Sequence, residues 1–464
     1  MAQQIDSRFL NKRYAPNAKA VSYMTKIAPL NAREFKAGSQ IHFKIPSNLS
    51  NSWIDPTSSL ISFSLENQST TCNVNLSAGG INGLFSKILL SQNGTTISDY
   101  NDFGTFFGIQ AKMNGDLSLY KGSASVMMGT RPSNHGNVED QENGLTLNEI
   151  GRRGERIAYG NSRQFASCIA HHSSLFNTGK MVTLKGQDMD LHYTIGDFNY
   201  SAIWDSTDNA NLAGLNNGHL VIKDVNLHLC IVQLSDEAQA LVEQANDAMV
   251  YEAIGVGSFH TTIPAGQSSY TVPLGLSYSS LLSLDAVFLP TVKGPNDDPV
   301  NPTVDFTNNT YVGNNLRNYA LLIDGLIVES PRSIEANPAV LVAYQLINSG
   351  SLHRLNNLPI LDGIHAYDAV NNVSEAGVAN QLSGKSANIL SQELCVYKRT
   401  SGNGWSDSQS RKICSGRSTL ASTTALQFSY NDQNNVKQTN LAVFAQFRQL
   451  IAYNPQTNSF LVSQ

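Results

Sequence analysis

Few residues in this 464-residue sequence have the types and spacing that chemistry requires. The adjacent His171 and His172 offer two imidazoles, the groups that most often bind transition metals. Neighbouring side chains in regular structure point in different directions, however, and no CxxC pair or acidic partner lies at a chelating spacing. Residues 383–386 read Ser-Gly-Lys-Ser, the end of a phosphate-binding loop, but Ala379 stands where its first glycine is required. Both patterns are more typical of ordinary structure than of a site.

The common catalytic signatures are missing from the sequence. It contains no HExxH, GxSxG or GxGxxG motif. Residues 297–298 are two aspartates flanked by Pro295 and Pro299, which is typical of a turn, and they lack the alternating oxygen ligands of a calcium loop. We therefore predict no catalytic residue, no metal site and no cofactor, and we expect a protein that is not an enzyme.

Basic residues are concentrated at the start of the chain. Eight Lys or Arg residues against two acidic ones give residues 1–45 a formal charge of +6, whereas the remainder carries −11. Arg8, Lys12, Arg13 and Lys19 are the candidate interaction residues, because they could contact phosphates of a nucleic acid or of lipid headgroups. A solvated tail, or pairing with an acidic neighbouring subunit, remains the alternative.

The composition favours strands and turns over helices. Charged residues make up 14% of the chain, compared with about 25% in ordinary soluble domains, and Asn, Ser, Thr and Gly take their place. The five cysteines are far apart and odd in number, which predicts reduced thiols. The chain opens on polar residues and has no apolar run of about 18 residues, so we expect it to fold in a reducing, aqueous compartment.

Short segments with a two-residue apolar period recur along the chain and predict strands. Residues 1–40 lack any sustained period and predict an extended arm that becomes ordered only against a partner. The predicted strands are centred on 41–45, 61–65, 74–76, 191–195, 225–231, 319–323 and 441–447. Close to the middle of the chain, Ser235 precedes two acidic residues and an apolar helical face, which predicts a connecting helix over 235–248.

The two halves of the chain show the same order of features. Asn93-Gly94 and Asp324-Gly325 each lie between apolar runs, and these dipeptides are strong signals for a tight hairpin because both residues need positive φ. Each hairpin is followed by a predicted helix, over about 100–113 and 333–347. The hairpins are 231 residues apart, against a half-length of 232, which favours an internal duplication of one β-domain.

The order of short motifs resembles the double jelly-roll major capsid proteins of polinton-like viruses, virophages and adintoviruses. In that family an extended strand and a Tyr-Ile-Asp segment precede a Leu-Phe-Ser segment, an apolar strand and an Asn-Gly hairpin. Here the matching segments of the first half are 43–46 (Phe-Lys-Ile-Pro), 53–56 (Trp-Ile-Asp-Pro), 84–88 (Leu-Phe-Ser-Lys-Ile) and 93–94, with Trp53 in place of Tyr. Those of the second half are 263–266 (Ile-Pro-Ala-Gly), 281–290 ending in Leu-Pro, 324–325 and 454–455 (Asn-Pro). Residues 122–163 match no part of the family pattern.

The resemblance implies an all-β fold of two tandem jelly-roll β-barrels with a few short helices. We expect a basic N-terminal arm over 1–40, a first jelly roll over 41–232, a linker helix over 233–250 and a second jelly roll over 251–464. The implied function is that of a major capsid protein, a homotrimeric pseudohexagonal capsomer in the icosahedral shell of a double-stranded DNA virus. Implied partners are other copies of the chain, neighbouring capsomers, and minor capsid and vertex proteins, with an internal membrane or packaged DNA as further partners of the arm. The implied location is the virion capsid, assembled in the host cytoplasm or nucleus.

Two other functions are compatible with the same sequence. A carbohydrate-binding or carbohydrate-active β-sandwich would use an exposed Trp53, Trp204 or Trp405 as a stacking platform beside hydrogen-bonding groups. A minor capsid or spike protein would share the composition and would differ mainly in its copy number in the particle.

Overall fold

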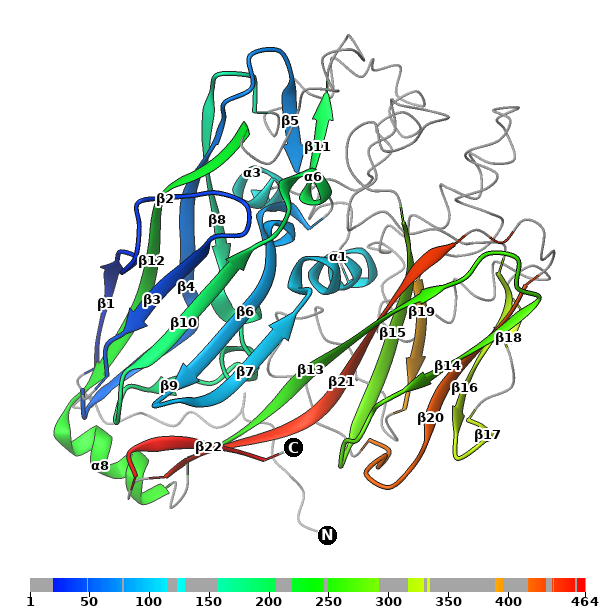
Figure 1. Cartoon of the computed structure of the whole chain (residues 1–464). Coiled ribbons are helices and arrows are strands. Elements are labelled where there is room, and N and C mark those ends of the chain that lie inside the picture. Colours follow the sequence, from blue (N-terminus) through cyan, green and yellow to red (C-terminus); the bar gives the residue numbers. More distant parts are fainter. Residues whose placement is uncertain are drawn as a thin grey trace, which may run out of the picture.

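The computed structural model describes most of the two predicted domains. The described residues are 20–47, 49–76, 79–114, 123–129, 157–205, 219–245, 249–291, 316–328, 332–333, 389–394, 416–430, 436, 438–454 and 457–463. Within them no helix is both long enough and apolar enough to cross a bilayer. Figure 1 shows two sheet structures side by side, joined through β13 and β21 and separated by helix α1.

The first barrel consists of two facing antiparallel sheets. One has the order β1-β12-β4-β8, with the short strands β2 and β9 at its margins, and the other has the order β3-β10-β6-β7. Their bounds are β1 Ala20–Ile27, β2 Glu34–Phe35, β3 Gln40–Ile45, β4 Ser52–Asn67, β6 Phe85–Gln92, β7 Thr95–Asn101, β8 Ser162–Cys168, β9 Val182–Thr183, β10 Met189–Ile195 and β12 Leu220–Leu234. A separate pair is formed by β5 Asn73–Leu76 and β11 Ala202–Asp205.

The second barrel is built in the same way. Its sheets have the orders β13-β21-β15-β19, extended by β22, and β14-β20-β16-β17, extended by β18. Their bounds are β13 Val250–Ile263, β14 Ser269–Leu274, β15 Leu281–Pro290, β16 Leu316–Ile323, β17 Leu326–Ile327, β18 Arg332–Ser333, β19 Ile389–Glu393, β20 Thr424–Tyr430, β21 Thr439–Asn454 and β22 Ser459–Ser463.

The two barrels share one strand order. If the principal strands of each half are numbered along the chain, leaving out the short strands β2, β5, β9, β11, β18 and the terminal β22, both halves pair as 1-8-3-6 and 2-7-4-5. This is the arrangement of a jelly roll, in which two Greek keys form two packed sheets. The predicted duplication and the predicted double jelly roll are therefore confirmed at the level of topology.

The helices among the described residues are short and lie outside the sheets. They are α1 Phe103–Asn114, α3 Ser123–Met128, α6 Phe198–Ser201 and α8 Asp236–Ala245, with 3-10 turns η2 Gly80–Leu84, η3 Ile169–His171 and η4 Phe176–Thr178. The predicted connecting helix is α8, where the Ser235 hydroxyl accepts a hydrogen bond from the Ala238 N–H (3.3 Å) and acidic residues occupy the first turn. The helix predicted over about 100–113 is α1. The one predicted over 333–347 lies outside the described residues beyond Ser333, which ends β18.

Both predicted hairpins are present at equivalent places. Asn93 and Gly94 have φ values of 48° and 76° and connect β6 to β7, and Asp324 and Gly325 have φ values of 54° and 74° and connect β16 to β17. In each barrel the two strands joined by the hairpin are strands 4 and 5 in the numbering given above. Because each turn requires left-handed backbone at two successive residues, Asx-Gly dipeptides are well suited to both places.

The start of the first barrel differs from the predicted boundary at residue 41. Residues 20–27, assigned to the arm from the sequence, form β1, which pairs with β12 from Ala20 opposite Leu234 to Ile27 opposite Leu227. Six of the eight residues in β1 are exposed, among them Val21, Tyr23 and Met24, so most of its apolar side chains lie outside the core. The backbone ladder to β12, rather than side-chain burial, holds this strand in the sheet.

Candidate functional site: the junction between the barrels

The face that holds the two barrels together begins at helix α1. Phe106 and Ile109 of this helix pack against the outer surface of the second barrel's β13-β21-β15-β19 sheet, where they meet Val287 of β15 and Phe444 of β21. Phe106 is 2% exposed, and its ring centroid lies 5.5 Å from that of Phe444. The helix that follows β7 of the first barrel thus fills the space between the barrels (Figure 1).

Strand β15 contributes to two apolar cores because both of its faces are covered. Phe288 points into the interior of the second barrel, whereas its neighbours Val287 and Leu289 belong to the cluster around α1. A strand that is buried on both faces contains a continuous apolar run instead of an alternation, and residues 286–290 read Ala-Val-Phe-Leu-Pro. The unbroken run in the sequence is therefore the local signature of the junction.

A buried polar contact accompanies this apolar one. The Asp285 Oδ2 atom accepts hydrogen bonds from the Gln110 Nε2 atom of α1 (3.1 Å) and from the Gln446 Nε2 atom of β21 (3.0 Å). All three side chains are buried. Because a buried carboxylate that loses its donors pays its full desolvation cost, the contact favours one alignment of the barrels over displaced ones.

The lower ends of β13, β21 and β22 extend beneath the first barrel and complete its core (Figure 1). The buried residues Tyr251, Ile451, Tyr453 and Phe460 belong to the same apolar cluster as the first barrel's interior. The Phe460 N–H also donates to the Oε1 atom of Gln92 at the end of β6 (2.8 Å).

Two further hydrogen-bonded contacts fix the same region. The Tyr251 hydroxyl donates to the Met181 carbonyl and accepts from the Thr183 N–H, each at 3.3 Å, and burial raises the pKa of Tyr251 to about 12, so its proton is retained. At the β21–β22 turn, the Gln187 N–H donates to the Asn458 carbonyl (3.2 Å). The second barrel therefore contacts the first at several separate places, including α1 and this turn, which restrains both tilt and rotation between them.

Trp53, a candidate stacking platform, is buried. It is 8% exposed, and its Nε1–H donates to the Gln239 Oε1 atom of α8 at 2.9 Å. Its role is to seat the connecting helix on β4, assisted by an ion pair between Lys185 and Glu243 (2.7 Å). The side chain of Trp204 and the whole of Trp405 lie outside the described part of the structure.

The adjacent histidines His171 and His172 belong to the first barrel. His172 is fully buried, and its Nε2–H donates to the Asn82 Oδ1 atom (3.0 Å) while its Nδ1 atom accepts from the Tyr193 hydroxyl (2.9 Å). Burial lowers the pKa of His172 to about 3, so the imidazole is neutral at physiological pH. With both nitrogens hydrogen-bonded inside the core, His172 acts as a structural residue.

Other sequence candidates lie outside the described residues. These are the arm residues Arg8, Lys12, Arg13 and Lys19, the loop-like segment 383–386, the aspartates 297–298, Cys395 and Cys414. Of the three described cysteines, Cys168 and Cys230 are free thiols, in agreement with the prediction, and Cys72 is buried.

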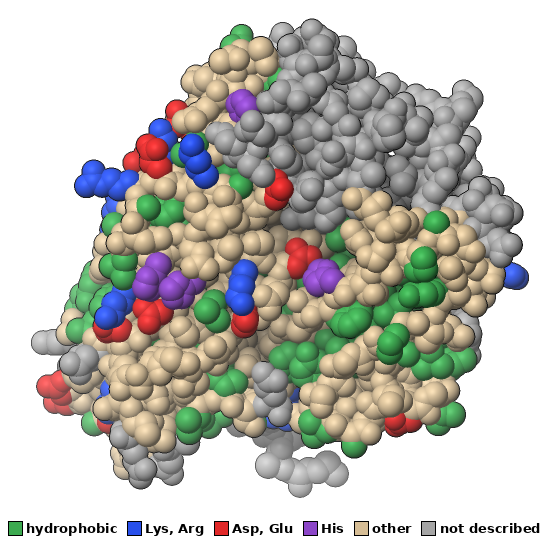
Figure 2. All heavy atoms as spheres, in the orientation of Figure 1, with side chains coloured by type: hydrophobic (Ala, Val, Ile, Leu, Met, Phe, Trp, Pro, Cys, Tyr) green, Lys and Arg blue, Asp and Glu red, His purple; other side chains and the backbone are tan. Residues whose placement is uncertain are grey.

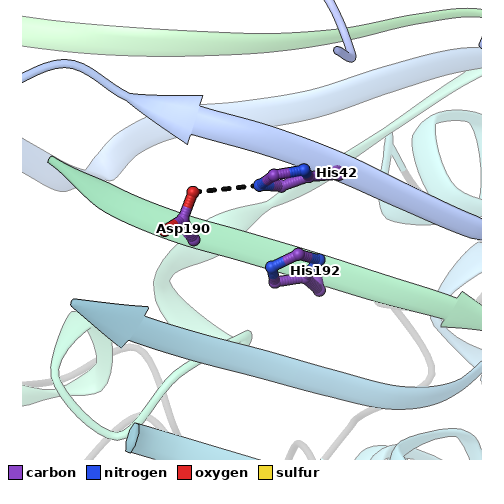
Figure 3. Close-up of side chains that lie close together, drawn as sticks. All are labelled: His42, Asp190 and His192. Carbon is purple, nitrogen blue, oxygen red and sulfur yellow. Dashed lines mark hydrogen bonds and ion pairs between the residues drawn. The ribbon is translucent and has the colours of Figure 1, made fainter. Parts of the chain in front are cut away.

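One group of chemically capable side chains was missed by the sequence analysis. His42 on β3 and Asp190 and His192 on β10 lie together on the outer surface of the β3-β10-β6-β7 sheet (Figure 3). Figure 2 shows histidine side chains beside acidic and basic ones on this face of the molecule. The only local signal is the spacing Asp-x-His within one predicted strand, and its meaning depends on which strand lies alongside.

Comparisons with known proteins agree with the topology. No protein-family model matches the sequence, and no curated protein matches it significantly. Among solved structures, the chain resembles the PBCV-1 virus capsid (TM-score 0.59, 11% identity, covering 98% of this chain and 99% of that one). It also resembles the Faustovirus major capsid protein (0.56, 8%, 95% and 92%) and the mavirus major capsid protein (0.51, 10%, 95% and 90%). At these identities the similarity establishes the fold, a double jelly roll over nearly the whole chain.

Proposed function

We propose that this protein is the major capsid protein of an icosahedral double-stranded DNA virus, and that three copies form one capsomer. The observation that supports this most strongly is the repeated strand order, 1-8-3-6 and 2-7-4-5, in two barrels of one chain. Three such chains around a threefold axis present six similar barrels and so approximate a hexagon. Solved structures with the same fold over nearly their full length are described as capsids and major capsid proteins.

The junction suits this role because a hexagonal tile requires a constant angle between its barrels. Packing of Phe106 against Phe444 at one place, and the turn at Asn458 at another, hold the barrels as one body. The low content of charged residues, 14%, is also favourable, since flat contacts between identical subunits tolerate few unpaired charges once water is removed. The function is thus carried by surfaces and requires no catalytic pocket.

The basic segment before β1 is assigned to contacts within the shell. Four basic residues precede the first strand: Arg8, Lys12, Arg13 and Lys19. Their positive charge would attract negatively charged partners. The proposed partners are neighbouring capsomers, minor capsid proteins, an internal membrane and packaged DNA. The protein would accordingly be located in the virion capsid after assembly in the host cell.

The carbohydrate-binding alternative is less well supported. Its stacking platform needs a tryptophan face open to solvent, and Trp53 is instead buried against α8. No described feature favours a minor capsid protein over the major one.

The oligomeric mass tests the proposal directly. Light scattering after size exclusion, or native mass spectrometry, should give three times the chain mass of 50.4 kDa, and negative-stain images should show particles with a hexagonal outline. A protein that stays monomeric at high concentration would refute the proposed capsomer. A chain lacking residues 2–19 should still form trimers but should assemble shells poorly, whereas loss of trimers would show that this segment is part of the subunit contact.

A further inference from the structure

The cluster formed by His42, Asp190 and His192 is created by strand register. β3 and β10 are antiparallel neighbours, and His42 lies directly opposite His192. Residues two positions apart on a strand share a face, so Asp190 joins the two histidines on the outer surface of the sheet. The two imidazole rings are stacked with centroids 4.1 Å apart and planes 15° apart, and the His42 Nε2–H donates to the Asp190 Oδ1 atom at 2.9 Å (Figure 3).

From this geometry we infer that His42, Asp190 and His192 bind a Zn²⁺ ion. Two imidazoles and one carboxylate are a typical zinc ligand set, and three protein ligands leave a fourth position for water. The candidate ligand atoms already lie within 4.8 Å of one another, whereas the ligands of a tetrahedral zinc lie about 3.3 Å apart. The ligand atoms must therefore move closer together, and rotation of the side chains can provide a movement of this size.

The required rotation is about the Cβ–Cγ bonds of the histidines. In stacked rings the nitrogen lone pairs run side by side, so each ring must turn for its lone pair to point at a shared ion. The side chains have room to do so, because those of His42 and Asp190 are 29% and 36% exposed. The backbone ladder between β3 and β10 holds the Cα positions during this change.

The charges around the cluster favour a cation at this place. Lys44, opposite Asp190, is paired with Asp188 at 3.0 Å, and Lys87 on β6 is paired with Asp99 on β7 at 3.0 Å. The nearby described lysines are thus neutralised by other carboxylates, and the Asp190 carboxylate faces the two imidazoles.

A bound ion would also link two strands of the sheet. Its bonds to His42 on β3 and to Asp190 and His192 on β10 would tie together strands 2 and 7 of the first barrel.

The test is a zinc titration of the full-length, untagged protein after treatment with a chelator and dialysis. Calorimetry and elemental analysis should give one Zn²⁺ per chain, and Co²⁺ should produce the intense visible absorption of a tetrahedral site. His42→Ala, His192→Ala and Asp190→Asn should each weaken zinc binding at least tenfold. Asp190→Asn keeps the shape of the side chain, so its effect reports on coordination and not on folding.

A matched control is available in the second barrel. His260 is also partly exposed beside a single carboxylate, with its Nε2 atom 3.7 Å from the Asp102 Oδ2 atom, but no second histidine faces it among the described residues. His260→Ala should leave the zinc affinity unchanged. If the double variant His42→Ala/His192→Ala binds zinc as tightly as the unmodified chain, or if no stoichiometric binding occurs, the inference is refuted. The measurement is independent of trimer formation, so it succeeds or fails separately from the proposed function.

Discussion

The junction at α1 can be perturbed by truncating Phe106 to alanine. This ring is 2% exposed and packs between the barrels, not inside either one. Deleting a buried phenylalanine side chain generally costs about 3–5 kcal/mol, because apolar contact is lost and a cavity remains. Since the ring belongs to the contact between α1 and the second barrel, we expect this cost to fall on the opening of the junction, while both barrels remain folded.

Hydrogen exchange measured by mass spectrometry is the suitable assay because it reports local opening and does not require reversible unfolding of the whole protein. A loss of about 3 kcal/mol corresponds to an increase of roughly a hundredfold in the exchange rate. Phe106→Ala should produce this increase in peptides covering α1, and trimer images should show barrels with a variable spacing.

Phe428→Ala is the matched control for the same chemical change. Phe428 is fully buried inside the second barrel, where its ring lies 5.2 Å from that of Phe288. This variant should accelerate exchange in β16 and β20 and should leave α1 much less affected. If Phe106→Ala changes exchange in α1 by less than tenfold, or if both variants accelerate the same peptides, the argument that α1 packing fixes the barrels is incorrect.

Two further perturbations test the turn contact and the first barrel's core. Gly186 has φ of 120°, and a Cβ atom there would lie 2.5 Å from the Asn458 carbonyl oxygen. Gly186→Ala should therefore destabilise the turn contact by about 1–3 kcal/mol. Hydrogen exchange in β22 should become faster. Gly160→Ala, at φ of 68° with open space around it, should show only the smaller backbone cost, and equal effects of the two variants would contradict the steric explanation. His172, whose pKa is lowered to about 3 in the folded protein, binds its proton near pH 6.5 when unfolded, so stability should fall as pH drops from 6.5 toward 3, by at most about 1.4 kcal/mol per pH unit. In His172→Gln, the free energy of unfolding measured across this range should depend less steeply on pH. If its slope equals that of the unmodified chain, His172 is not the cause of the pH dependence.

Much of the fold was predictable because it is encoded locally. The alternation of apolar and polar residues located β3, β4, β5, β10, β12, β16 and β21, since successive side chains on a strand face opposite sides of a sheet. The dipeptides at 93–94 and 324–325 identified equivalent hairpins in both barrels, because only a few residue types accept two successive positive φ values. Ser235 marked the start of α8 for a similarly local reason. These signals, repeated at half the chain length, predicted a duplicated β-domain, and the resemblance to double jelly-roll capsid proteins implied the jelly-roll topology.

Features that depend on pairing between distant segments were decided by the tertiary structure. β1 was assigned to the arm from the sequence and is recognised by its ladder to β12, about 200 residues away. The cluster of His42 with Asp190 and His192 exists because β3 pairs with β10 in one register, and a shift of one residue would place the side chains on opposite faces. The burial of Trp53 depends in the same way on where α8 comes to lie. Local patterns determine which residues form strands and turns. The sites on this protein are made by contacts between distant segments, and the register of those contacts cannot be read from any one segment.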